Sequence, residues 1–131
     1  MKKIIAILLV IVMAAVSLAG CGGGADEQKV VGFINAGPDD YYAQFGDAFK
    51  AIGESIGYKI IEVNSDYSPE KELANVQDMI AQDVDAIAVI TAGAAGSAAS
   101  ISAADEADVP IFFIAGKPEL DPGTDLTGQC D

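Results

Sequence analysis

Two acids and two tyrosines stand side by side at residues 39–42, directly after a strongly apolar segment. Asp39 and Asp40 can each accept hydrogen bonds from several hydroxyl groups, because a carboxylate offers about four lone-pair sites. Tyr41 and Tyr42 each present an aromatic face, which packs against the C–H face of a ring-shaped polyol. The four residues together predict a binding site for a small molecule with several hydroxyl groups.

The same loop has a plainer interpretation, because acids are common at the start of a helix. In that interpretation Asp39 or Asp40 caps the helix and one tyrosine packs in the core. Consecutive residues of a helix point about 100° apart, so we expect that Tyr41 and Tyr42 do not both face a ligand. The two interpretations are compatible, since one aspartate can cap the helix while the other faces the ligand.

Three further residues are candidates for this site because each lies at the end of an apolar segment. Asn35 ends the first segment, Thr91 follows the third, and Lys117 follows the fourth, where a solvated lysine without a ligand is the alternative. Residues 93–97 contain glycines, as a phosphate-binding turn does, but they lack the lysine of a P-loop, so a turn that opens a helix is the simpler interpretation. Residues 64–67, after the second segment, are interpreted as an ordinary polar loop.

Several classes of chemistry are excluded by composition. The chain has no histidine and two cysteines, so a Ser-His-Asp triad, a Cys-His pair and the usual zinc sites lack their residues. No G-x-G-x-x-G fingerprint follows the first apolar segment, which argues against a nucleotide cofactor. We therefore expect no catalytic residues, no metal and no cofactor. With 20 acids against 7 basic residues, the net charge of −13 also argues against nucleic acid as a partner.

The first 20 residues have the layout of a secretion signal. Lys2 and Lys3 precede an apolar run, residues 4–16, which small residues follow. The apolar stretch is shorter than the roughly 20 residues that a membrane-spanning helix needs. We therefore predict that residues 1–20 are a signal peptide and that the protein is exported.

The segment Leu18-Ala19-Gly20-Cys21 resembles the lipobox of bacterial lipoproteins, in which the chain is cut before the cysteine. The resemblance implies that the sulfur of Cys21 carries a diacylglyceryl group. Two acyl chains hold a protein stably at a membrane, and residues 21–28 then form the lipidated end and a flexible tether. The expected location is the extracytoplasmic face of the cell membrane; the alternative is an ordinary cleaved signal with a chance cysteine. Cys130 then has no partner, which excludes a disulfide within the domain.

The remaining chain alternates apolar segments with segments of helical spacing. The apolar segments are residues 30–34, 59–63, 86–90 and 111–115. This alternation is typical of βαβ units and predicts an α/β fold, a doubly wound parallel sheet with the flavodoxin-like strand order 2-1-3-4-5. Such sheets bind ligands at the carboxyl ends of their strands, near the point where the strand order reverses.

Local signals place the boundaries of the helices and strands. Ser68-Pro69, followed by Glu70 and Glu72, predicts the start of a helix, and Gly57 predicts the end of the preceding one. The segments at 86–90 and 111–114 are apolar at every position, which predicts strands buried on both faces. A fifth strand is expected from residue 126 or 127, and the domain resembles a fragment because the sequence stops at residue 131.

Three stretches together resemble one family. The order of "KVVGFINAGPDDYYAQFGDAF", "YKIIEVNSDYSPEKELANVQDMIAQDVDAIAVI" and "ADVPIFFIAG" resembles the amino-terminal lobe of the sugar-type periplasmic binding proteins, the ribose- and galactose-binding group that serves ABC importers. The resemblance covers residues 29–131 and implies a first, incomplete lobe of a two-lobe fold. It also implies that a hinge joins the lobes, that the ligand is trapped between them, and that the closed form docks on permease subunits.

The resemblance carries over to a few positions. Tyr41 and Tyr42 look like the aromatic pair that follows the first strand in ribose-type members, and Asp39 stands at the place of a polar ligand contact. Ala115-Gly116 stands where many members carry Asp-Arg to hold sugar hydroxyls, which argues against ribose or galactose itself.

The expected function is therefore a lipid-anchored solute-binding component of an ABC importer that binds a sugar, a polyol or a similar small molecule. The alternatives are an extracellular small-molecule signalling receptor of the same fold and, less favoured, a Rossmann-like enzyme. The sugar-responsive repressors that share the fold are excluded, because a signal and a lipobox stand where a DNA-binding segment would be.

Overall fold

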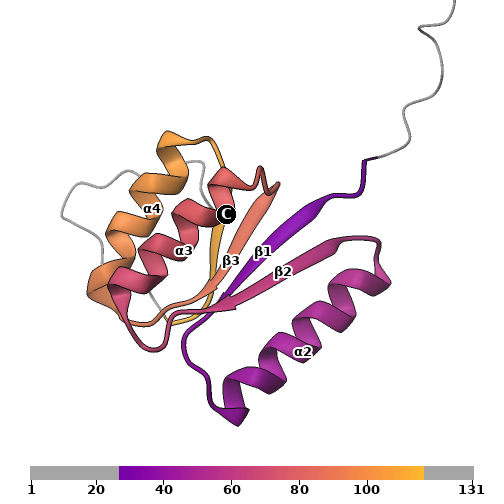
Figure 1. Cartoon of the computed structure of the whole chain (residues 1–131), viewed down its shortest axis with the longest axis horizontal. Helices are drawn as coiled ribbons and strands as arrows, with labels where there is room; N and C mark the ends of the chain where they lie inside the picture. Colours follow the sequence, from indigo (N-terminus) through magenta and orange to yellow (C-terminus); the bar gives the residue numbers. More distant parts are fainter. Residues whose placement is uncertain (1–26, 117–131) are drawn as a thin grey trace, which may run out of the picture.

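Four parallel strands form one sheet with the order β2-β1-β3-β4, and helices cover both of its faces (Figure 1). The structure is a computed structural model that describes residues 27–116 of the 131-residue chain. Its elements are β1 (Val30–Asn35), α2 (Asp40–Ser55), β2 (Lys59–Asn64), α3 (Pro69–Ala81), β3 (Ala86–Ile90), the short 3₁₀ turn η1 (Ala94–Gly96), α4 (Ser97–Glu106) and β4 (Ile111–Ala115). The predicted α/β class and the order of the first four strands are confirmed; the predicted fifth strand lies outside the described residues.

The core has two layers, one on each face of the sheet. Ile34 and Val89 lie in the layer beneath α3 and α4, whereas Phe33 and Ile90 lie in the layer beneath α2. Neighbouring residues of a strand point to opposite faces of the sheet, so a strand that is apolar at every position is suited to burial on both faces. In none of the helices that the structure describes is there an apolar stretch long enough to cross a membrane.

Burial on both faces was predicted for β3 and β4 but holds only for β3. Phe112 and Ile114 of β4 are 44% and 46% exposed. The cause is the placement of α2, which packs against β1 and β2 and leaves the same face of β4 without a described helix over it (Figure 1). Within residues 27–116, one face of β4 is therefore apolar and open.

Helix α2 forms where the spacing predicts it, and it packs on the sheet through the rings of Tyr42 and Phe49. Phe49 stacks on Phe33, with ring centroids 4.5 Å apart and planes 13° apart. Ile52 and Ile56, at the same helical spacing, are 64% and 67% exposed. As predicted, the helix ends before Gly57, whose φ of +95° favours glycine.

Helix α3 begins as predicted. Ser68 is the N-cap, with its hydroxyl accepting from the backbone N–H of Lys71, and Pro69 takes the first helical position. Glu72 lies in the first turn of the helix, as predicted, and its side chain is fully buried. Its partners lie in the loop after β3 and are described with the site.

Candidate ligand-binding site

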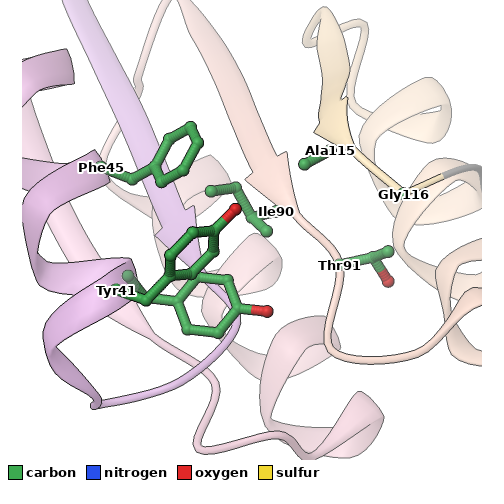
Figure 2. A pocket seen from close by; sticks show the side chains of 7 residues that line it. Tyr41, Phe45, Ile90, Thr91, Ala115 and Gly116 are labelled. Carbon is green, nitrogen blue, oxygen red and sulfur yellow. The ribbon is translucent and has the colours of Figure 1, made fainter.

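A hollow of about 170 Å³ opens at the carboxyl ends of β3 and β4, beside the first turns of α2. Its lining residues are Tyr41, Tyr42, Phe45, Ile90, Thr91, Ala115 and Gly116. Figure 2 shows Tyr41 and Phe45 on one side of it, and Thr91, Ala115 and Gly116 on the other. The hollow lies between the end of β3 and α2, the helix that follows β1, and the strand order reverses between β1 and β3, which is the place where doubly wound sheets bind ligands.

Both tyrosines of the first loop line this hollow, although we expected that only one would face it. Tyr42 is half-buried and packs against the core layer beneath α2, while Tyr41 is 63% exposed. The rings meet edge to face, with centroids 5.1 Å apart and planes 80° apart. The 100° between consecutive helical residues therefore does not keep the two rings apart.

Two more aromatic rings extend this pair into a row. Phe45, one helical turn after Tyr41, lies 5.3 Å from it at 60°. Tyr67, from the loop after β2, lies 5.9 Å from Tyr42 at 65°. Phe45 was not among the candidate residues, although its i, i+4 spacing from Tyr41 was a signal for it.

Asp39 is the N-cap of α2, as the plainer interpretation of the loop proposed. Its Oδ1 accepts from the backbone N–H groups of Tyr41 at 3.0 Å and Tyr42 at 3.3 Å. Its Oδ2 accepts from the hydroxyl of Tyr67. The Tyr67 bond and, to a smaller extent, the two backbone bonds lower the pKa of Asp39 below its ordinary value. The carboxylate is thus held ionised beside the aromatic row.

Tyr67 is the residue of this region that sequence reasoning missed. Its ring lies directly over Gly37, where any Cβ would collide with it. Its own φ is +59°, and its backbone N–H donates to the carbonyl of Ala36 at 2.7 Å. The same bond to Asp39 raises the pKa of Tyr67 to about 12. Only the predicted strand order could have indicated Tyr67, because neighbouring parallel strands bring together the loops that follow them.

Asn35 lies beneath the aromatic row and is not part of the lining. It is 2% exposed, and its Nδ2 donates to the carbonyl of Tyr42 at 2.7 Å and to Oε1 of Glu62 at 3.1 Å. Its Oδ1 is buried without a hydrogen-bond partner. Gly46 makes room for Glu62, because any Cβ there would overlap the carboxylate. Asn35 thus supports the backbone of Tyr42 from below.

The remaining candidates differ in position. Asp40 is exposed in the first turn of α2 and does not line the hollow. Thr91 does line it, but its Oγ1 shares a hydrogen bond with Ser97 at 2.7 Å and accepts from the N–H of Gly93 at 3.0 Å. Lys117 and Cys21 lie outside the described residues.

The buried carboxylate of Glu72 fixes the loop after β3. It accepts from the backbone N–H of Ala92 at 2.7 Å, from the hydroxyl of Ser100 at 3.1 Å and from that of Ser97 at 3.4 Å. A carboxylate bound to this loop from inside is unfavourable for a phosphate, so the geometry favours the simpler interpretation of residues 93–97. Among residues 27–116 no group of acids or cysteines is arranged to hold a metal ion.

Comparisons with known proteins agree with this architecture. The model of the periplasmic binding protein domain matches residues 31–126 of the chain. No curated protein matches the chain. The periplasmic binding protein component of the arabinose ABC transporter from Shewanella sp. ANA-3 is similar in structure, with a TM-score of 0.67 and 24% identity over 72% of this chain and 32% of its own.

Two further solved structures are similar. An ABC transporter solute-binding protein from Bacillus halodurans C-125 with bound myo-inositol has a TM-score of 0.61 and 23% identity, over 70% of this chain and 32% of its own. A periplasmic ribose ABC transporter protein from Conexibacter woesei has a TM-score of 0.64 and 24% identity, over 78% and 34%. At these identities the likeness concerns the fold, and this chain spans about a third of the length of each.

The match also bears on the question of enzymatic activity. Periplasmic binding proteins are transport components without enzymatic activity, which agrees with the prediction that the chain is not an enzyme. The match covers all four strands and every helix of residues 31–116. The chain therefore belongs to the family of the periplasmic binding protein domain and forms one lobe of its fold.

Proposed function

We propose that this chain is the first lobe of an ABC-importer solute receptor that binds a sugar, a polyol or a similar small molecule. The observation that carries the proposal is the hollow with Tyr41, Tyr42 and Phe45 on one side, placed where the strand order reverses. Aromatic faces pack against the C–H faces of sugars and cyclitols, while neighbouring polar groups take their hydroxyls. The similar structures are those of an arabinose transporter component, a protein with bound myo-inositol and a ribose transporter protein, which supports the same ligand class here.

The size of the hollow supports a site shared between two lobes. At about 170 Å³ it is smaller than the roughly 300 to 1,000 Å³ that pockets for small molecules usually have. The similar structures are about three times as long as the matched part, which leaves room for a second lobe. Ligand capture would then proceed by closure of the second lobe over this surface, with the ligand favouring the closed state.

The proposal includes the amino-terminal segment. Residues 1–20 act as the signal peptide, Cys21 receives the lipid, and residues 22–28 tether the lobe to the extracytoplasmic face of the membrane. The basic start, the apolar run and the lipobox of the sequence support this assignment. Replacement of Cys21 by serine should abolish partitioning into the detergent phase; unchanged partitioning would contradict the anchor.

Tyrosine fluorescence offers a direct test of the site. The chain has four tyrosines and no tryptophan, and three of the tyrosines belong to the aromatic row. The fourth, Tyr58, lines a separate apolar groove between α2 and β2. The purified chain should show a saturable fluorescence change with L-arabinose or with myo-inositol.

Matched variants assign that change to the site. Tyr41→Ala should remove the change, whereas Tyr58→Ala should keep it. We expect the loss in a complete two-lobe relative to be about 1 to 3 kcal/mol of binding free energy, the range for burial and stacking of an aromatic ring. If neither ligand saturates the signal, or if Tyr41→Ala behaves like Tyr58→Ala, the proposed site is wrong.

A further inference from the structure

Asn35, the last residue of β1, connects the start of α2 to β2. Its Nδ2 donates one hydrogen bond to the carbonyl of Tyr42 at 2.7 Å and another to Oε1 of Glu62 at 3.1 Å. An amide NH₂ group has two donor hydrogens, so both are used. Because Tyr42 lines the hollow, the side chain of Asn35 links an exposed acid of β2 to the aromatic side of the candidate site.

Only one orientation of the Asn35 amide suits these two partners. The residue is 2% exposed, and its Oδ1 has no hydrogen-bond partner, which is unfavourable for a buried acceptor. If the amide were turned over, Oδ1 would face the carbonyl oxygen of Tyr42 and the carboxylate of Glu62, which both only accept. The bond to the ionised group is the type that contributes more, so Glu62 holds the amide in the observed orientation.

A glycine of α2 lets Glu62 approach the same helical turn. Helix α2 lies along β2 (Figure 1), and the side chain of Glu62 points to the face beneath α2 because it alternates with Ile61. Gly46 is one turn after Tyr42, and any Cβ on it would overlap the carboxylate of Glu62. In an α-helix the carbonyl of Tyr42 accepts from the N–H of Gly46. The acid therefore lies against the turn whose carbonyl Asn35 binds.

We propose that Asn35 and Glu62 are positioning residues of the ligand site: Glu62 orients the amide of Asn35, and Asn35 fixes the first turn of α2 through the carbonyl of Tyr42. The assignment rests on the proposed function, because it concerns the same site. Neither residue lines the hollow. The rings of Tyr41 and Tyr42 are in contact, and Phe45 packs against Tyr41, so a shift of this turn moves all three aromatic lining residues.

Two substitutions of Glu62 test the role of its acceptor. Glu62→Gln keeps an oxygen that accepts from Asn35, whereas Glu62→Leu removes it, and both should fold because the residue is exposed. Glu54→Leu replaces an exposed glutamate near the end of α2 and is the control. Binding of L-arabinose or myo-inositol, measured by tyrosine fluorescence, should weaken by about three- to tenfold in Glu62→Leu, the range for loss of one hydrogen bond. It should change by less than about twofold in the other two variants.

Ring-proton NMR of the ligand-free chain reports the position of the rings directly. Tyr41 and Tyr42 meet edge to face with centroids 5.1 Å apart, so the chemical shifts of each ring depend on where the other lies. These shifts should move in Glu62→Leu and stay in Glu62→Gln. A residue that only stabilised the fold would lower the melting temperature when replaced by leucine and would leave the shifts and the ligand affinity unchanged.

An exchange of functional groups tests the route through Asn35. Asn35→Asp removes the Nδ2 donor and places two carboxylates side by side. Adding Glu62→Gln restores a hydrogen bond between positions 35 and 62 in the opposite direction, but the carbonyl of Tyr42 still lacks its donor. The double variant should therefore recover melting temperature over Asn35→Asp without recovering ligand affinity. Recovered affinity would contradict the role of the Tyr42 carbonyl; if Asn35→Asp does not fold, the Glu62 variants decide the question.

The outcomes keep this proposal apart from the proposed function. If Glu62→Leu binds ligand as tightly as wild type does, the positioning role is wrong and the proposed function stands. If wild type binds neither ligand, the proposed function fails, and unchanged ring shifts in Glu62→Leu would overturn the positioning of Tyr42 as well. Weaker binding and moved shifts in Glu62→Leu, with both preserved in Glu62→Gln, support the proposal.

Discussion

The hydroxyl of Tyr67 donates a hydrogen bond to Oδ2 of Asp39 and so ties the loop after β2 to the first turn of α2. These two loops follow neighbouring strands and meet at the carboxyl edge of the sheet. Because Oδ1 of Asp39 already caps the helix, one carboxylate joins the helix start, the second loop and the aromatic row. The link makes Tyr67 part of the architecture of the site even though it does not line the hollow.

One tyrosine should titrate late in alkali. The bond to Asp39 stabilises the protonated phenol and raises the pKa of Tyr67 from its ordinary 10.0 to about 12. The stability that this bond contributes is fully present below pH 10.0 and is lost as the pH rises through about 12. Tyrosinate absorbance should therefore show one step near pH 12 that is missing in Tyr67→Phe. A late step that persists in Tyr67→Phe would contradict the assignment.

Asp39, the hydrogen-bond partner of Tyr67, should give the opposite dependence of stability on pH, and in the acid range. The pKa of Asp39 lies below its ordinary 3.8, mainly because of the bond from Tyr67. Its contribution to stability is present above pH 3.8 and is lost as the pH falls through the lowered value. The difference in melting temperature between wild type and Asp39→Asn should thus close in this acid range. A difference that is independent of pH would argue against an ionic role for Asp39.

The two faces of the sheet should respond differently to the loss of a phenylalanine. Phe33 is 1% exposed and stacks on Phe49, so Phe33→Ala should cost about 3 to 5 kcal/mol of unfolding free energy. Phe112 is 44% exposed on the open face of β4, so Phe112→Ala should cost less than about 1 kcal/mol. Denaturant unfolding of the same chain measures both. Equal losses would mean that the face of β4 is covered in solution.

Most of the fold follows from patterns that the sequence carries locally. Apolar segments predict β1 to β4 within one residue, and Ser68-Pro69 and Gly57 mark helix boundaries because their backbone and capping preferences are local. Exposure of Phe112 and Ile114 was not predictable, because the same apolar residues suit a covered strand and an open one. Whether a helix covers a strand depends on the tertiary arrangement.

Some residues of the candidate site could likewise be predicted from the sequence, and others could not. Tyr41, Tyr42 and Thr91, which line the hollow, were predicted from strand ends, since the carboxyl edge of a parallel sheet is a general property of the fold, whereas Asp40 from the same stretch does not line it. Tyr67 and Glu72 were missed because their partners are 28 and 20 residues away in the sequence, respectively. A tyrosine in a polar loop and a glutamate in a first helical turn look like surface residues until the strands are paired.

Glu72 should be the carboxylate on which the loop after β3 depends most. Glu72→Ala leaves the N–H of Ala92 and the hydroxyl of Ser100 without their acceptor in a buried place, which should cost about 1 to 3 kcal/mol. Hydrogen exchange at the amide of Ala92 should accelerate, because its bond at 2.7 Å is lost. Glu70→Ala removes an exposed carboxylate from the same helical turn, one that accepts from the Ser68 hydroxyl at 2.7 Å, and should leave the exchange of the Ala92 amide unchanged. If the Ala92 amide exchanges at the same rate in Glu72→Ala as in wild type, then Glu72 does not hold the loop that brings Thr91 to the hollow.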